Sequence, residues 1–282
     1  DPPFGLLAEA VQASVFMAHP YHWPVIGWMT DLETMTRADL IAYYRAFYRP
    51  NNAILVVAGD IVHDDVIRLA RRHFGGIEPG PEVPDVRIEE PPQRGERTVT
   101  VRKEVQLPGL IVAYRVPGSL HEDAPALNIA EYILFRGRSS RLYQRLIYRD
   151  QLATDLSGGF YLRRDPSTFS VRATARPGVD LERLRHAVQE TIESFESAPP
   201  AKDEIEKARN QLTSDYLFGQ EHNFDLGAGL GAEECRSSWR DFFAFHDRCL
   251  AATAEDVSRA ATAHLNERGR TVGLLIPEGG RS

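Results

Sequence analysis

Two stretches of the chain, residues 35–60 and 252–279, repeat one order of features. Each has a threonine, an acidic residue three positions later, an amphipathic helical pattern, a short turn and a run of apolar residues. A threonine with an acidic residue at the third helical position is typical of a helix N-terminus. A short continuous apolar run is typical of a strand that is buried on both faces. The repetition predicts two structurally similar domains that end in the same way.

Both copies place their elements at defined positions. In the first, Thr36 caps a helix that ends at the PNN turn of residues 50–52, and the run AILVVA at 53–58 forms the buried strand. In the second, Thr253 caps the helix and residues 271–276 (TVGLLI) form the strand. The same reading predicts further helices at 6–17, 63–74, 123–135, 141–149, 181–196, 202–217, within 224–234 and at 240–251, and further strands at 97–105, 110–116, 153–162 and 168–175.

The pattern predicts an α+β fold with two related domains of mainly antiparallel sheet packed with helices. Residues 1–77 are expected to be the C-terminal part of a first domain, and 96–282 a complete second domain. Between them, residues 78–95 are rich in proline and carboxylates, which indicates an extended linker. A sheet that is present only in part leaves strand edges and apolar faces uncovered. We therefore expect either self-association or the removal of an N-terminal half after folding.

Charge and hydropathy exclude several classes of protein. The net charge is −7 and lysine and arginine form no stripe, which argues against a nucleic-acid partner. No apolar run approaches the length of a membrane span. Cys235 and Cys249 lack metal-binding spacing, so two free thiols are favoured over a disulfide, which stays open. The compartment stays unknown, and cytoplasm and periplasm are both possible.

Several short motifs occur in one order across the first part of the chain. They are His19-Pro20-Tyr21, Pro24, Gly27, Tyr48, Pro50-Asn51-Asn52-Ala53 and Gly59-Asp60. In these motifs the chain resembles the zinc metallopeptidases of the pitrilysin/insulinase type, and most closely their bacterial branch that is similar to mitochondrial processing peptidase. The resemblance implies duplicated α+β domains and a zinc-dependent endopeptidase that encloses peptides or unfolded polypeptides. It also implies a homo- or hetero-oligomer with a related subunit.

The zinc motif of that family, H-x-x-E-H, is missing from the sequence. On a helix, this spacing lets two histidines share one metal while the glutamate polarises the bound water. None of the nine histidines has a second one in that frame: His19, His22, His63, His73, His121, His186, His222, His246 and His264. We therefore expect zinc in the full-length protein and none in this fragment, no catalytic or metal-ligating residue here, and no peptide hydrolysis by the fragment itself.

This chain also departs from a second motif of the family. The resemblance implies an Arg and a Tyr, seven positions apart, that hold the substrate backbone after the loop GRSSRL of residues 137–142. Aligned on residues 151–152, these positions are Ile147 and Thr154, so the substrate-binding residues stay unknown. The lack of this pair fits a zinc-bearing subunit whose first half is missing. It also fits a subunit with neither function, such as a non-catalytic partner or structural subunit of a metallopeptidase-like complex. An unrelated α+β binding module is a third, weaker alternative.

The histidines and aromatics of residues 19–28 are candidate site residues with a simpler explanation. Prolines 20 and 24 prevent a helix between His19 and His22, so a shared metal would need ligands from elsewhere. We expect packed loop histidines with backbone partners. We expect core packing, rather than a substrate platform, for the aromatics Tyr21, Trp23 and Trp28.

The glycines of LGAGLGAEE superficially suggest a phosphate loop. Gly227, Gly229 and Gly231 are neither preceded by a strand nor followed by Lys-Ser/Thr. We expect a flexible turn between helices at these positions.

Overall fold

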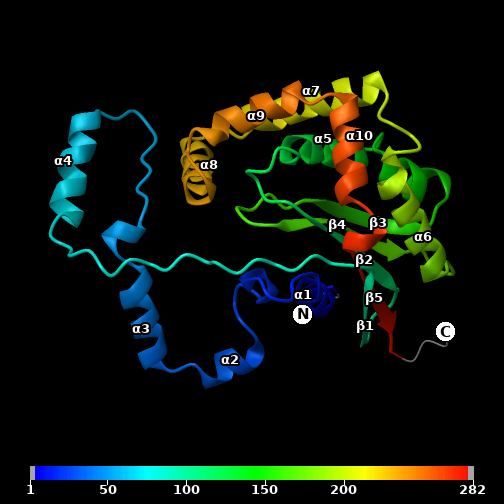
Figure 1. Cartoon of the computed structure of the whole chain (residues 1–282), viewed down its shortest axis with the longest axis horizontal. Coiled ribbons are helices and arrows are strands. Elements are labelled where there is room, and N and C mark those ends of the chain that lie inside the picture. Colours follow the sequence, from blue (N-terminus) through cyan, green and yellow to red (C-terminus); the bar gives the residue numbers. More distant parts are fainter. Residues whose placement is uncertain (1–3, 279–282) are drawn as a thin grey trace. The chain divides into compact units, whose positions relative to one another are not determined.

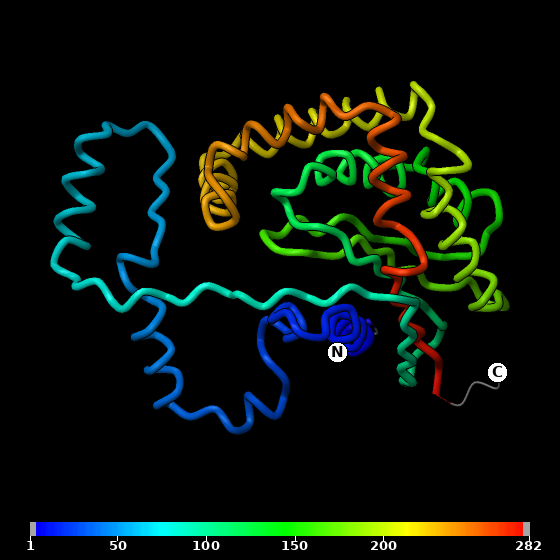
Figure 2. Tube along the Cα trace, in the orientation of Figure 1, coloured from blue at the N-terminus to red at the C-terminus, as the bar shows by residue number. Residues whose placement is uncertain are grey.

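The computed structural model describes residues 4–278, and the chain divides into two compact units (Figures 1 and 2). Unit 1 comprises Asp1–Pro24, Glu89–Ser214 and Phe245–Ser282, and unit 2 comprises Val25–Ile88 and Asp215–Ala244. The fold is α+β, as expected. No helix in the described part of the chain has the length and apolar character that a bilayer crossing requires.

A five-stranded mixed sheet forms the centre of unit 1 (Figure 1). Its spatial order is β1-β5-β2-β4-β3. The strands are β1 (Arg97–Lys103), β2 (Gly109–Val116), β3 (Ala153–Phe160), β4 (Ser167–Ala175) and β5 (Arg270–Pro277). Only the β1–β5 pair is parallel, and the other three pairs are antiparallel. The mainly antiparallel sheet is the one that the sequence predicts.

Helices cover both faces of this sheet, and β2 shows how the sequence permits it. Alternate residues of a strand point to opposite faces. Leu110 and Val112 join the main core, whereas Ile111 and Ala113 join a smaller cluster on the other face. Because all four are at most 8% exposed, β2 is apolar without interruption rather than alternating.

The main core is closed by helices that follow the strands in sequence. Figure 1 shows α5, α6 and α10 on the face of the sheet opposite α1. The helices that contribute to this core are α5 (Ala124–Phe135), α6 (Leu181–Ile192), α7 (Lys202–Phe218), α9 (Asp241–Ala251) and α10 (Ala254–His264). Three shorter helical segments follow helices of this group: the π-helix η3 (Tyr143–Arg149) after α5, and the 3₁₀ turns η4 (Glu193–Phe195) after α6 and η5 (Glu267–Gly269) after α10. Each expected helix of this region is present.

Helix α1 (Gly5–Val15) covers the other face of the sheet. Its residues Leu7, Val11 and Val15 are at most 4% exposed and form a cluster with β2 and β5. The approach is so close that a Cβ added at Gly273 would lie 2.3 Å from Val11. The described residues from Phe4 to Pro24 therefore belong to unit 1, and residues 25–77 belong to unit 2, so the compact units differ from the domain boundaries expected from the sequence.

The linker of residues 78–95 contains no helix or strand, and its end is anchored in unit 1. The Glu90 carboxylate accepts hydrogen bonds from the backbone N–H groups of Met17, Ala18 and His19 at 2.8, 2.8 and 2.9 Å. The Arg115 guanidinium lies 3.4 Å away, and the Glu90 side chain is 1% exposed. A buried carboxylate with this many donors is a strong local anchor.

Unit 2 contains helices and turns but no strand among its residues. Its elements are α2 (Met29–Thr34), α3 (Arg37–Phe47), the 3₁₀ turn η2 (Pro50–Asn52), α4 (His63–Phe74) and α8 (Asn223–Arg236). The expected buried strand at 53–58 is wrong for this structure, since Ile54, Leu55 and Val57 are 50, 58 and 43% exposed. The physical reason is that unit 2 offers no strand with which these backbone groups could pair.

The glycines of residues 227–231 lie inside α8, so the expected flexible turn is wrong. Added Cβ atoms at Gly227 and Gly231 would lie 3.8 and 3.4 Å from Val56, and one at Gly229 would lie 2.5 Å from the Phe242 ring. The absent side chains let the segment of residues 53–58 and Phe242 approach the helix closely. Glycine costs helix stability, and here close packing compensates for that cost.

Candidate functional site

The histidines of the loop after α1 have structural contacts. The Nδ1 atom of His22 lies 2.9 and 2.8 Å from the carbonyl oxygens of Ala13 and Phe16, so this atom carries the proton. His19 is 4% exposed, and its Nδ1 accepts a hydrogen bond from the Tyr21 N–H at 3.2 Å. These are the contacts of packed loop histidines. Trp23, however, is 56% exposed, so the expectation that it belongs to a core is wrong.

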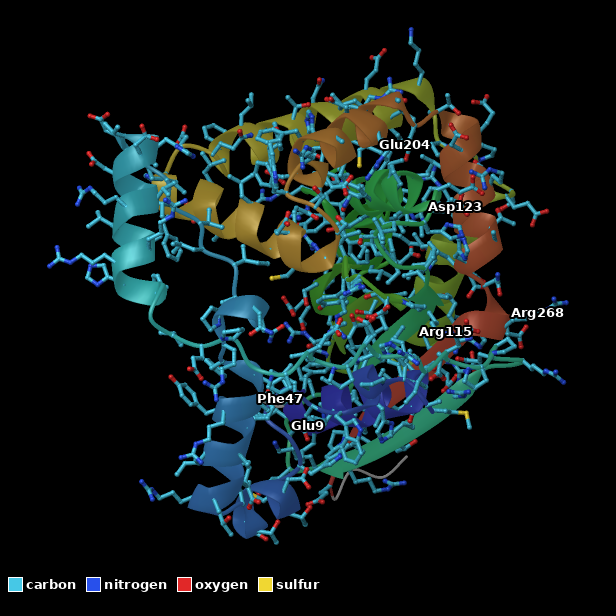
Figure 3. The ribbon with its side chains drawn as sticks, turned by 60° about the vertical axis from the view of Figure 1, so that its left-hand side comes forward. Glu9, Phe47, Arg115, Asp123, Glu204 and Arg268 are labelled. Atoms are coloured by element: carbon cyan, nitrogen blue, oxygen red, sulfur yellow. The ribbon has the colours of Figure 1, made fainter. Side chains whose placement is uncertain are left out.

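The loop GRSSRL is fastened to α7 by its arginine. Gly137 has a φ of +77°, a conformation that favours glycine. The Arg141 guanidinium donates to both oxygens of Glu204 at 2.7 Å, and it also donates to the Ala198 carbonyl at 3.0 Å. The hydrogen bond from Arg141 lowers the pKa of Glu204 below its usual range. Figure 3 labels Glu204, at the start of α7. The hydrogen bonds of Arg141 thus attach the loop to α7 and to the residue before Pro199.

The two positions where the family resemblance implies an Arg and a Tyr lie in different elements and have different surroundings. Ile147, in η3, packs against the main core as a half-buried side chain. Thr154 is exposed near the start of β3, and its hydroxyl lies 3.4 Å from the Thr174 carbonyl oxygen on the neighbouring strand. Arg145, which is close by, contacts Asp150 and Glu190. The side chains at these two positions provide no pair of hydrogen-bonding groups that could hold a peptide backbone.

Unit 2 carries an apolar groove beside the segment of residues 53–58. The groove has a volume of about 450 Å³ and is lined by Leu55, Val57, Val66, Leu69, Ala70, His73 and Phe74. Leu55 and Val57 therefore face α4, whereas Val56 and Ala58 face the glycines of α8. The segment thus has helices on both sides, as a central strand of a sheet would have, while its backbone edges have no strand partner in unit 2.

Three side chains of types that can ligate a metal lie together in unit 1, at the N-terminus of α5. The Asp123 carboxylate is 2.9 Å from His264 Nε2 and 3.8 Å from His121 Nδ1. One donor atom from each of the three residues lies within 4.8 Å of the others. Figure 3 shows Asp123 beside α10, the helix whose last residue is His264.

The carboxylate of this group is buried and charged. Asp123 is 4% exposed, and Arg259 Nη1 lies 2.7 Å from its Oδ1. Burial alone would raise the pKa of Asp123, but the hydrogen bonds and charges of His264 and Arg259 lower it below its usual value. The group therefore presents an ionised oxygen, Oδ2, toward two imidazoles.

Sequence reasoning missed this group because its members are far apart in the chain. His121 and Asp123 are separated by one residue just before α5, but His264 lies 141 residues after Asp123. The available signal is a His-x-Asp tripeptide just before a helix. Only the packing of α10 against α5 brings the second imidazole to it.

Comparisons with known proteins give a consistent result. The family model described as the peptidase M16 inactive domain matches residues 34–212. The zinc protease PqqE of Helicobacter pylori is 28% identical over 279 residues, which cover 98% of this chain and 63% of PqqE. The probable mitochondrial-processing peptidase subunit beta of Schizosaccharomyces pombe is 24% identical over 241 residues, which cover 80% of this chain and 51% of that protein. This chain thus spans less than two thirds of the length of either relative.

A solved structure shares the fold over nearly the whole chain. The crystal structure of a protease from Helicobacter pylori superposes with a TM-score of 0.92 at 28% identity, covering 98% of this chain and 67% of that one. This similarity extends beyond the residues of the family match to α1, α9, α10 and β5. The comparison therefore supports the fold on both sides of the matched segment.

Proposed function

The chain belongs to the family of peptidase M16 inactive domains, and from this premise we propose that it forms the non-catalytic part of a zinc-dependent endopeptidase. The substrates would be peptides or unfolded polypeptides. The part described here would help to enclose them, together with a related domain or subunit in a homo- or hetero-oligomer.

The observation that carries this proposal is the family match together with the segment of residues 53–58. Its side chains have helices on both sides, but its backbone edges have no strand partner in unit 2. A strand of a related domain would satisfy those edges. We accordingly propose residues 1–77 as the C-terminal part of a first peptidase domain, 78–95 as a linker and 96–282 as a second domain of inactive type.

The catalytic zinc of such an enzyme does not fit the residues of this chain. The sequence contains no H-x-x-E-H. The two histidines that converge in the described part of the chain, His121 and His264, come from a loop and a helix end, with no glutamate between them to act on a bound water. No catalytic step is therefore assigned to these residues, and the zinc of the longer protein would be held by residues outside them.

A comparison of two purified proteins tests the proposal. One is the 282-residue chain, and the other is the longest natural protein that contains it. Both are incubated with an unstructured peptide that carries a fluorescent donor and a quencher. We expect hydrolysis by the longer protein, loss of hydrolysis with a chelator and recovery with Zn²⁺, and no hydrolysis by the 282-residue chain. Chelator-sensitive cleavage by the 282-residue chain would contradict the proposal.

A non-catalytic partner or structural subunit of a metallopeptidase-like complex is the second candidate function. It is favoured by Ile147 and Thr154, which occupy the two positions where the family resemblance implies an Arg and a Tyr. In this case the longer protein would lack H-x-x-E-H and would not cleave the peptide alone. Cleavage that appears only after a related zinc-bearing subunit is added would support this second candidate over the first.

A further inference from the structure

We propose that His121, Asp123 and His264 form a binding site for a divalent transition metal ion of the Zn²⁺ class, which joins the N-terminus of α5 to the C-terminus of α10. No catalytic role is assigned to this site. It departs from the expectation that this fragment holds no zinc, because that expectation considered only the H-x-x-E-H pattern.

The donor set selects the class of metal. Two imidazole nitrogens and one carboxylate oxygen suit Zn²⁺ and related transition metals. Ca²⁺ and Mg²⁺ instead prefer sites built from oxygen ligands alone. Oδ2 of Asp123 would supply the carboxylate oxygen, and one ring nitrogen of each histidine would supply the other two donors. At His264 the ion would replace the proton that Nε2 now shares with Oδ2.

The distances are close to those that a tetrahedral ion needs. Metal bonds of about 2.0–2.1 Å place neighbouring ligand atoms about 3.3 Å apart. The His264 Nε2–Asp123 Oδ2 distance is 2.9 Å and the His121 Nδ1–Asp123 Oδ2 distance is 3.8 Å, which are shorter and longer than this value by about half an ångström. A movement of His121 toward the carboxylate would shorten the longer distance, and an ion between His264 and Asp123 would lengthen the shorter one. The nitrogen atoms of the two histidines lie within 4.8 Å of each other.

His121 is the member of the group that can make this movement. Its side chain is 42% exposed, and it lies in the loop before α5. Its Nδ1 now accepts a hydrogen bond from the backbone N–H of Asp123 at 3.1 Å, so this nitrogen carries a lone pair rather than a proton. Metal binding would replace that hydrogen bond. The exposed side of His121 also leaves a coordination position for a water molecule.

Arg259 orients the carboxylate and moderates the affinity. It occupies Oδ1 of Asp123 at 2.7 Å and leaves Oδ2 to the two imidazoles. The guanidinium also repels a divalent cation, so we expect weaker binding than at structural zinc sites that are built from thiolates. Because an ion bound only by the folded chain stabilises it, metal should raise the unfolding temperature of unit 1.

Metal titration of the 282-residue chain, prepared without an affinity tag, tests the site. Cys235 is replaced by Ser in all samples, because an exposed thiol binds metals by itself. After chelator treatment and its removal, Zn²⁺ and Co²⁺ are titrated by calorimetry, and Co²⁺ also by visible absorption. We expect one saturable site, Co²⁺ bands typical of nitrogen and oxygen ligands in a low coordination number, and a rise in unfolding temperature with Zn²⁺.

Matched variants assign the binding to the three residues. His121→Gln and His264→Gln should each weaken Zn²⁺ binding by at least about tenfold, since even outer partners of metal ligands cost that much. His186→Gln is the control, because His186 is an exposed histidine of the same unit on α6. It should bind Zn²⁺ as the parent does. His121 is partly exposed, so its variant should fold even if the His264 variant does not.

Two results would overturn the proposal. One is the absence of saturable Zn²⁺ binding by the parent chain. The other is equal affinity of the parent and the His121→Gln variant. Either would make the group a hydrogen-bonded contact between α5 and α10 without a metal. Neither depends on peptide hydrolysis, so this proposal and the proposed function can fail separately.

Discussion

The two copies of the helix–turn–strand repeat have the same local structure and then diverge. In the first, the Thr36 N–H donates to Asp39 at 2.9 Å and the Asp39 N–H donates to Thr36 at 3.3 Å. In the second, the corresponding distances between Thr253 and Asp256 are 3.0 and 3.1 Å. Each cap begins an 11-residue helix, and a 3₁₀ turn follows each helix. Up to this point, sequence and structure repeat together.

The apolar runs after these turns differ completely. Residues of β5 lie between β1 and β2 in the sheet, and Val272 is fully buried. Ile54, in the corresponding run of the first copy, is 50% exposed and belongs to no strand. A helix cap is satisfied by residues three positions apart, whereas a strand needs neighbours from elsewhere in the chain. Local sequence therefore determines the caps, and strand formation depends on whether partners are present.

The largest expected effect comes from a charge placed in each run. Val272→Asp buries an unpaired carboxylate in the main core and should cost at least about 4 kcal/mol in the free energy of unfolding of unit 1. Ile54→Asp places the same charge at an exposed position and should leave unit 1 unchanged. Thermal unfolding followed by circular dichroism measures both. An equal decrease in the unfolding free energy of unit 1 in both variants would contradict the proposed difference between the two copies.

A smaller effect is expected at the anchor of the linker in unit 1. Glu90→Gln removes a buried charge that accepts three backbone hydrogen bonds and should cost about 2 kcal/mol in the free energy of unfolding. The comparable contact in unit 2 is exposed: the Asn51 side chain exchanges hydrogen bonds with the Gly80 backbone at 2.8 and 3.1 Å. Asn51→Ala should therefore lower the free energy of unfolding by less than Glu90→Gln does. Urea unfolding of both variants measures the difference, and a greater cost at Asn51 would contradict this account of the linker.

The Glu90 anchor also gives a pH dependence with a defined sign. Burial alone would raise the pKa of Glu90, but hydrogen bonds from the N–H groups of Met17, His19 and Ala18 and the charge of Arg115 lower it. The stabilisation is therefore complete above the ordinary glutamate pKa of about 4.3 and is lost as the pH falls through the lower folded value. The difference in unfolding free energy between the parent and Glu90→Gln should shrink below that pH. A difference that grows in acid would contradict the assignment.

The smallest expected effect concerns the two caps. Thr253→Ala should cost about 1 kcal/mol in the stability of unit 1, because the helix that it caps packs in the main core. Thr36→Ala removes the same cap from α3, none of whose residues is buried, and should leave unit 1 unchanged. Amide exchange of β2, a buried central strand of unit 1, reports the opening of that unit. Slower or unchanged exchange of β2 in Thr253→Ala would contradict the expected loss.

Most elements of the fold were predictable because their signals are local. The capping residues Thr36 and Thr253, and the alternation of residues 97–103, indicate their elements without knowledge of the rest of the chain. The segment of residues 53–58 was not predictable, because its apolar character describes a strand whose partners unit 2 does not contain. The glycines 227–231 resemble a turn in sequence, and only the approach of Val56 and Phe242 explains their place in a helix.

The candidate sites also differ in whether the local sequence could predict them. The missing H-x-x-E-H and the residues Ile147 and Thr154 could be read from the sequence, because motif positions are counted along the chain. The group of His121, Asp123 and His264 could not, because it depends on α10 packing against α5. The position of α1 on the sheet of unit 1 is also a result of packing, since the periodicity of an amphipathic helix does not specify which apolar surface it covers.

The most direct test of the contrast between the two copies is amide hydrogen exchange of the 282-residue chain, at a concentration where light scattering finds a monomer. Residues 271–276 should exchange only through global opening of unit 1, since they lie between two neighbouring strands. Residues 53–58 should exchange at nearly the rate of an unfolded peptide. Comparable protection of both segments in the monomer would contradict the claim that residues 53–58 have no strand partner among residues 4–278.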